Sequence, residues 1–228
     1  MTDSSPSNPL PDTSGAGAPH EGGPVLHAGA ALADASIAMI MVHGRGAGPA
    51  DILGLSTLFE NPAVACLAPG ASGNTWYPYS FLSPRERNQP GISSGLGVIG
   101  ALVEGVEAAG VPRERQVLLG FSQGACLASE FAYRNPGRFG GVVLYSGGLI
   151  GPLGSEWETD GKMEDTPVFL GCSDVDAHIP VERVHETAEV FQAMGAAVTP
   201  RIYPGMGHLV NEDEIHFTRG LLKHLTSE

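Results

Sequence analysis

The sequence predicts an α/β protein with a mostly parallel, doubly wound sheet and helices on both of its faces. From residue 36 onwards, short apolar runs alternate with amphipathic segments, a pattern that indicates strands joined by crossover helices. The run Ile37–Val42 is apolar at every position, as expected for a strand that is buried on both faces. A chain of 228 residues is long enough for one such domain with a substantial core.

The expected strands follow these apolar runs. Val25–His27 is short and is expected at an edge of the sheet, whereas the longer runs are expected inside it. The remaining strands are predicted at Ile37–Val42, Val64–Leu67, Gln116–Phe121, Gly141–Tyr145, Val168–Gly171 and Val198–Tyr203.

The expected helices lie between these strands. A proline favours the first turn of the first helix, and Ser93 or Ser94 could cap the second. The helices are predicted at Pro49–Phe59, Ser93–Ala109, Gln123–Arg134, Pro180–Met194 and Asn211–Leu225. Two stretches between elements, Pro69–Gly91 and Gly147–Asp165, lack periodicity, and long irregular loops of this kind often carry function.

Composition narrows the classes of partner. Lys and Arg number 12 against 25 Asp and Glu, giving a formal net charge of −13, which argues against nucleic acid or an anionic membrane surface. No apolar run approaches the roughly 20 residues of a membrane span. The three cysteines form no metal-type pair, and their odd number suits a reducing cytoplasm. Residues 1–23 are rich in Ser, Pro and Gly and are expected to form a flexible tail before a single domain at 24–228.

The segment "GFSQGA" places Ser122 between two glycines directly after a predicted strand. Small neighbours permit a sharp strand-to-helix turn, and such a turn lifts the serine hydroxyl clear of the sheet. Ser122 is therefore the candidate nucleophile.

Two later segments supply a candidate base and a candidate acid at the ends of other strands. His208 follows the last strand in "GMGH", and Asp174 and Asp176 follow Val168–Gly171 in "GCSDVD". The carboxyl ends of parallel strands meet at one edge, where ligands bind. Ser122 is too weak a nucleophile when neutral, so His208 would take its proton and an aspartate would orient the imidazole. The chain order serine, aspartate, histidine is that of α/β-hydrolases.

A glycine-rich turn after the first long strand, "HGRGA", could complete the site. In an acyl-transfer reaction, backbone N–H groups stabilise the oxygen that becomes negative. The expected donors are the N–H groups of Arg45 and of Gln123, the residue after the nucleophile. His43 is interpreted as a residue that orders the turn by hydrogen bonding.

"HGRGA", "GFSQGA", the aspartate segment and "GMGH" together resemble the phospholipase/carboxylesterase family of α/β-hydrolases, which includes the acyl-protein thioesterases. The resemblance covers roughly residues 37–225. It implies a serine hydrolase of small-molecule esters or thioesters that needs no cofactor or metal, with Asp176 rather than Asp174 as the triad acid. The family usually has proline where this chain has Ala177, which keeps Asp174 in consideration.

The aromatic loop after Pro69 departs from the shorter motif of the best-known thioesterases. Its Trp76, Tyr77 and Phe81 are interpreted as walls of an acyl pocket, and the resemblance adds Leu149 from the loop after "YSGG". The same aromatic side chains could instead pin the loop to the sheet. Sequence leaves open a lactone, lysophospholipid or peptide as substrate, a non-catalytic binding role, and a homodimer.

Overall fold

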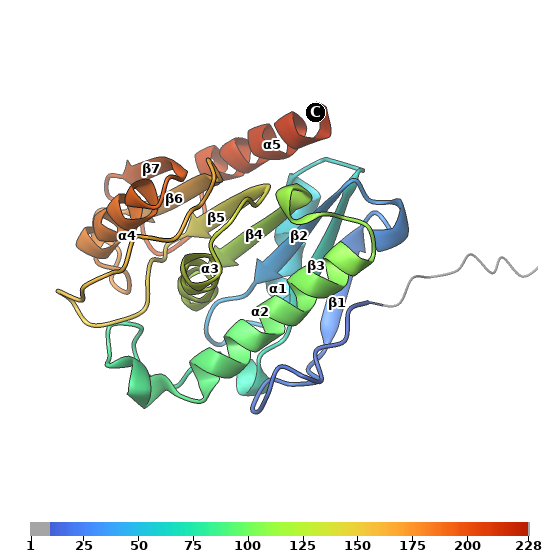
Figure 1. The fold of residues 1–228 in the computed structure, drawn as a ribbon. Coiled ribbons are helices and arrows are strands. Elements are labelled where there is room, and N and C mark those ends of the chain that lie inside the picture. The colour runs from blue at the N-terminus through green and yellow to red at the C-terminus, as the bar shows by residue number, and fades with distance from the viewer. Residues whose placement is uncertain (1–9, 228) are drawn as a thin grey trace, which may run out of the picture.

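The computed structural model describes residues 10–227, and within them seven strands form one sheet in the order β1-β3-β2-β4-β5-β6-β7 (Figure 1). Six strands run parallel, and β1 pairs antiparallel with β3 at one edge. The predicted fold class is therefore confirmed. The strands are β1 (Val25–Gly29), β2 (Ile37–Val42), β3 (Val64–Pro69), β4 (Gln116–Phe121), β5 (Gly141–Tyr145), β6 (Pro167–Ser173) and β7 (Ala197–Tyr203).

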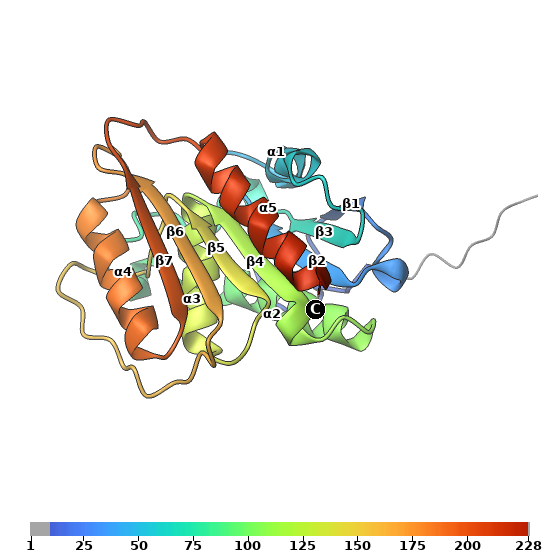
Figure 2. The ribbon, with the colours of Figure 1, turned by 90° about the horizontal axis from the view of Figure 1, so that it is seen from above.

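Helices cover both faces of the sheet (Figure 2). One face carries α2, α3 and α4, and the other carries α1 and α5. Their bounds are α1 (Pro49–Leu53), α2 (Gly91–Ala108), α3 (Gln123–Arg134), α4 (Val181–Ala193) and α5 (Glu212–Ser227).

The first predicted helix, Pro49–Phe59, is wrong as a single element. It ends at Leu53, and a 3-10 segment, Gly54–Leu58, follows it. Gly54 at the junction lowers the helical propensity of the chain where the helix changes. The other predicted helices and strands are present, with ends that differ by a few residues.

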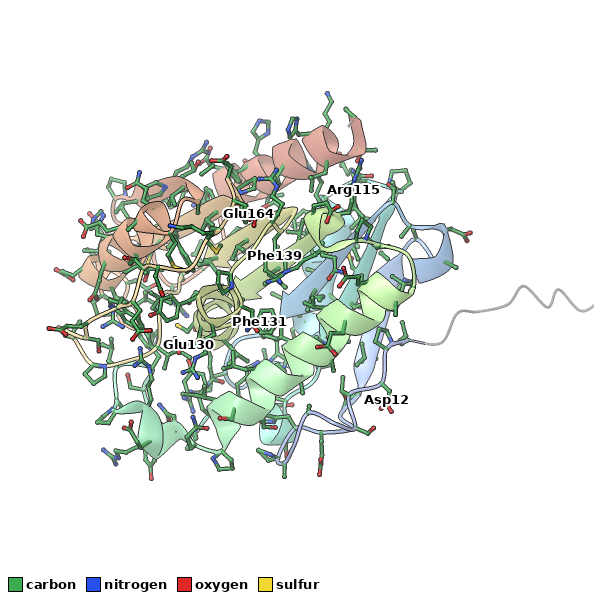
Figure 3. All side chains as sticks on the ribbon, in the orientation of Figure 1. Asp12, Arg115, Glu130, Phe131, Phe139 and Glu164 are labelled. Atoms are coloured by element: carbon green, nitrogen blue, oxygen red, sulfur yellow. The ribbon has the colours of Figure 1, made fainter. Side chains whose placement is uncertain are left out.

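The core forms two apolar layers, one on each side of the sheet, because successive strand residues point to opposite faces. In β2, Ala38 and Ile40 pack toward α2 and α3, whereas Met39 and Met41 pack toward α5. Phe131 of α3 and Phe139 before β5 lie in the first layer, with ring centroids 6.4 Å apart (Figure 3). Helix α2 is long and apolar enough to cross a membrane, but half of it is buried in this layer, as in the core helix of a globular domain.

Residues 10–23 differ from the predicted flexible tail, whose first nine residues lie outside the described part of the chain. His20 is 2% exposed. Its Nε2 bonds to the backbone oxygen of Trp76 at 2.8 Å, and its Nδ1 accepts from the N–H of Ser72 at 3.0 Å. Ser94 of α2 bonds to the backbone of both His20 and Gly17. Hydrogen bonds of His20 and Ser94 hold this segment, and Ala16 packs against the core beside them.

Deleting residues 1–22 is therefore expected to lower the melting temperature by roughly 5–10 °C. The deletion leaves the carbonyl of Trp76 and the N–H of Ser72 without their partner, at about 1–3 kcal/mol for each buried group, and a domain of this size shifts by about 2–4 °C per kcal/mol. Calorimetry of the truncated chain measures the shift. In the full chain, His20→Ala should reproduce much of the loss, with the exposed neighbour Glu21→Ala as the control. An unchanged melting temperature for both the truncated chain and His20→Ala would contradict the docking.

Candidate active site

Ser122 stands at a sharp turn between β4 and α3. Its backbone has φ 55° and ψ −120°, an unfavourable region for a residue with a side chain. A Cβ on Gly120 would lie 2.5 Å from the backbone of Gly124, and a Cβ on Gly124 would lie 2.1 Å from the carbonyl oxygen of Val42. Both glycines are therefore required sterically, which explains the small residues on either side of the serine.

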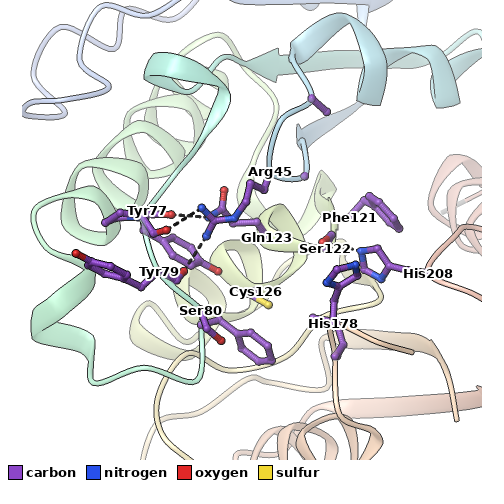
Figure 4. Close-up of a pocket in the computed structure, with 15 residues that line it drawn as sticks. Arg45, Tyr77, Tyr79, Ser80, Phe121, Ser122, Gln123, Cys126, His178 and His208 are labelled. Carbon is purple, nitrogen blue, oxygen red and sulfur yellow. Dashed lines mark hydrogen bonds between the residues drawn. The ribbon is translucent and has the colours of Figure 1, made fainter. Parts of the chain in front are cut away.

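The structure brings Ser122, His208 and Asp176 together, and Figure 4 shows Ser122 beside His208. His208 Nε2 lies 2.8 Å from Ser122 Oγ, and His208 Nδ1 lies 2.7 Å from Asp176 Oδ2. The imidazole is flanked by the rings of Phe121 and His178, with centroid distances of 4.9 and 4.8 Å. This geometry allows a proton to pass from the hydroxyl to an imidazole that a carboxylate orients.

Asp176 is held in its ionised form. Burial alone would raise its pKa, but hydrogen bonds from His208 and from the N–H groups of His178 and Ile179 lower it below the ordinary value. Its side chain is 0% exposed. An ionised carboxylate at this point favours the protonated imidazole that would form as the serine loses its proton.

Asp174, the alternative acid, bonds to the backbone of another loop instead of to His208. Its Oδ1 accepts a hydrogen bond from the N–H of Gly205 at 2.8 Å. That bond ties the end of β6 to the loop that carries His208. The carboxylate that contacts the imidazole is that of Asp176.

The two backbone N–H groups predicted to bind the substrate oxygen belong to Arg45, in the turn after β2, and to Gln123, directly after Ser122. Those of Arg45 and Gln123 make no hydrogen bond to another described residue, and Gln123 is the first residue of α3, whose N–H has no partner within the helix. Gly44 packs against Phe121 and Ser122, which places the turn after β2 beside the serine. Both N–H groups are thus available to an oxygen bound there.

The loop after β3 is tied to this turn by side chains that the sequence did not assign. The guanidinium of Arg45 donates to the carbonyl oxygens of Pro78 and Tyr79 at 2.9 and 2.7 Å (Figure 4). The amide of Gln123 accepts from the N–H of Trp76 and donates to the carbonyl of Tyr77. These bonds join residues more than 30 positions apart, and no sequence pattern predicts them. They hold the loop after β3 at several points.

Two of the four predicted pocket residues lie elsewhere. Trp76 is 0% exposed beneath the turn after β2, where its Nε1 donates to the carbonyl of His43 at 2.9 Å. Leu149 is also fully buried, and its N–H bonds to Thr187 of α4. Neither lines the cavity beside Ser122. Both side chains belong to the hydrophobic core, where they pack beneath the loops that line the cavity.

Tyr77 and Phe81 do line a cavity of about 600 Å³ beside Ser122 and His208. Further members of the wall are Gly44, Arg45, Ala47, Pro78, Tyr79, Ser80, Phe121, Gln123, Cys126, His178 and Ile179. A volume of this size suits a small organic ligand. Within residues 10–227, no group of three or more His, Cys, Asp or Glu side chains is arranged to hold a metal ion.

The predicted role of His43 in ordering the turn fits its contacts. His43 Nδ1 donates to the carbonyl of Gly44, and its Nε2 accepts from the N–H of Ala71. Burial lowers its pKa, which keeps the ring neutral and able to accept. The side chain is fully buried and lies outside the cavity wall.

Glu214 belongs to an acidic run at the start of α5, and it holds the far end of the loop that carries His208. Its Oε2 accepts from the N–H of Asn211 at 2.8 Å, and its own N–H donates to Asn211 Oδ1. The side chain is fully buried against Gly171, where a Cβ would lie 2.0 Å from Oε1. Burial raises the pKa of Glu214 to about 7; the Asn211 N–H opposes that rise and the charge of Asp213 adds to it.

We expect the free energy of unfolding of Glu214→Gln, measured relative to that of the wild type, to be higher at pH 8 than at pH 4.5. The pKa of this carboxyl is about 7 in the folded protein and ordinarily 4.5, so on raising the pH it ionises first in the unfolded chain. The wild type therefore loses stability as the pH rises from 4.5 to 7. At about 1.4 kcal/mol per pKa unit, the full cost is on the order of 3 kcal/mol. Urea denaturation of both proteins across this range measures it. Glu212→Gln, at an exposed position of the same helical turn, is the matched control. A difference that is constant with pH would refute the raised pKa.

Comparison with known proteins shows the family of this chain. The sequence profile of the phospholipase/carboxylesterase family matches residues 34–226. The chain belongs to the phospholipase/carboxylesterase family. The crystal structure of a phospholipase/carboxylesterase from Dyadobacter fermentans is 38% identical, with a TM-score of 0.83, and the match covers 88% of this chain and 96% of that one.

Curated relatives of the family are more distant in sequence. An acyl-protein thioesterase 1 from Kluyveromyces lactis is 29% identical over 151 residues, which cover 64% of this chain and 66% of that protein. A probable carboxylesterase from Oryza sativa is 26% identical over 171 residues, covering 72% of this chain and 62% of that protein. The chain thus spans just under two thirds of the length of these relatives.

Proposed function

We propose that this protein is a serine hydrolase that cleaves carboxylic esters or thioesters through an acyl-enzyme formed on Ser122. The observation that carries the proposal is the continuous contact from Ser122 Oγ through the imidazole of His208 to Asp176. Family membership supports it, because the relatives include named carboxylesterases and acyl-protein thioesterases.

In the first half of the reaction, Ser122 Oγ attacks the carbonyl carbon while its proton moves to His208 Nε2. The carbonyl oxygen becomes negative and is bound by the N–H groups of Arg45 and Gln123. Asp176 stabilises the imidazolium. The bond to the leaving alcohol or thiol then breaks, and that group takes the proton from His208 Nε2.

In the second half, water replaces the leaving group. His208 removes a proton from the water, whose oxygen attacks the acyl carbon, and the negative oxygen returns to the same two N–H groups. The bond to Ser122 Oγ breaks, and Ser122 recovers its proton from the imidazolium. The free acid leaves and the enzyme is restored. No step calls for a cofactor.

Labelling with a fluorophosphonate probe tests the nucleophile independently of the natural substrate. Labelling that Ser122→Ala abolishes would support the proposal, and an unlabelled wild type would refute it in favour of a non-catalytic binding protein. Short and long p-nitrophenyl esters, acyl-CoA thioesters, lysophospholipids and lactones then distinguish the bond that is cleaved. Preference for a lactone or lysophospholipid would move the assignment to another hydrolase of the same fold.

Two predictions from composition concern the surroundings of the enzyme. The three cysteines, Cys66, Cys126 and Cys172, are free and buried, and we propose on this ground a reducing, cytoplasmic location. Small-molecule esters are the proposed partners, while a homodimer is a hypothesis that sedimentation would test.

A further inference from the structure

The cavity beside Ser122 contains a buried hydroxyl that has no strong hydrogen-bond partner among the described residues. Tyr77 is 2% exposed and lines the cavity. Its Oη has no hydrogen-bond partner among the described residues. Burial raises its pKa well above the ordinary value, so the hydroxyl stays protonated and can donate. A buried hydroxyl without a strong partner destabilises the fold, and phenylalanine would avoid that cost at the same shape.

A thiol neighbours this hydroxyl. Cys126 Sγ interacts with Tyr77 Oη, but sulfur is a weak hydrogen-bond acceptor, so the hydroxyl has no strong partner among the described residues. Figure 4 shows the ring of Tyr77 extending from its loop toward Cys126. The donor therefore faces the inner part of the cavity rather than the solvent.

The position of Cys126 sets the distance from the reacting atoms. Cys126 lies four residues after Ser122, and its N–H donates to the carbonyl of Ser122 at 3.0 Å. The backbones of the two residues are thus about one helical turn apart, on the order of 5–6 Å, and both residues line the cavity. An acyl chain of about four or five carbons attached to Ser122 covers that span.

We propose that Tyr77 selects acyl groups that carry a hydroxyl or keto oxygen about one helical turn beyond the ester carbonyl. This inference rests on the proposed esterase function and names its substrate class. A plain alkyl chain would fill the same space but leave Tyr77 Oη unpaired, whereas a polar oxygen would accept its proton. Sites built to bond a polar group reject analogues that lack it by a large factor.

The test compares p-nitrophenyl 4-oxopentanoate with p-nitrophenyl pentanoate. The selectivity ratio is kcat/KM for the keto ester divided by that for the plain ester. We expect Tyr77→Phe to lower the ratio about tenfold or more, and comparing the two enzymes cancels the intrinsic reactivity of the esters. Tyr133→Phe, which removes a phenol of α3 that lies outside this cavity, should leave the ratio unchanged. Equal losses on both esters in Tyr77→Phe would overturn the proposal.

A second variant tests the hydroxyl without removing it. Cys126→Ser would give Tyr77 Oη a strong partner within the protein and should also lower the ratio. A ratio that stays at the wild-type value in Cys126→Ser and in Tyr77→Phe would refute the role of this hydroxyl.

Binding of the free acids distinguishes a failure of this proposal from a failure of the proposed esterase function. If the wild type hydrolyses neither ester, the proposed function fails. The subsite is then judged by whether 4-oxopentanoate raises the melting temperature of the wild type more than pentanoate does, and whether Tyr77→Phe removes the difference. Equal shifts from the two acids would overturn the subsite whatever the activity.

Discussion

Ser122→Ala is expected to lower kcat for ester hydrolysis about a million-fold, the loss seen when a triad nucleophile is removed from another serine hydrolase. Without Oγ there is no atom to form the acyl-enzyme, and only the oxyanion donors and substrate binding remain. The melting temperature should change little, because the Ser122 side chain is only partly buried and the backbone at φ 55° is strained for either residue.

Hydrolysis of p-nitrophenyl acetate by the purified variant measures the loss. Ser129→Ala offers a matched control on the same helix, since Ser129 is buried away from the cavity and bonds to the carbonyl of Cys126. A Ser122→Ala protein that keeps near wild-type turnover, with contamination excluded, would remove Ser122 as the nucleophile.

Asp176→Asn should reduce kcat about ten-thousand-fold, as the equivalent change does in one well-studied triad. The amide can present its N–H₂ to His208 Nδ1, which favours the wrong tautomer and withdraws the charge that supports the imidazolium. Asp174→Asn should have a far smaller effect, because the side-chain oxygen of asparagine can still accept from the N–H of Gly205.

Measuring kcat for both variants with one ester decides between the two aspartates. Melting temperatures show whether either loss reflects unfolding. An inactive Asp174→Asn beside a fully active Asp176→Asn would transfer the role of the acid to Asp174.

The sequence predicted the sheet and the position of the site because both depend on local patterns. Continuously apolar runs such as Ile37–Val42 need no partner to be interpreted as buried strands. Once the strands are parallel, residues that follow them must meet at one edge, which is why Ser122, Asp176 and His208 could be placed together before any distance was known.

Predictions that depend on which way a side chain faces were less successful. Aromatic content indicated that Trp76, Tyr77 and Phe81 would be buried, but not which of them would face the cavity. Trp76 turned inward because its indole N–H bonds to the carbonyl of His43. The docking of His20 was missed for a related reason: a single ring that bonds two backbone groups leaves no periodic signal.

His208, the proposed general base, follows β7, which lies at an edge of the sheet. Strand β7 has no fully buried residue and pairs on one side only, with β6. Edges of this kind open at a lower free energy than the core, in local fluctuations that leave the rest folded. Each such opening would carry the imidazole away from Ser122 while β2, β4 and β5 stay paired. If His208 is the general base, as we propose, activity would thus depend on the local stability of this edge and could be lost and regained without global unfolding.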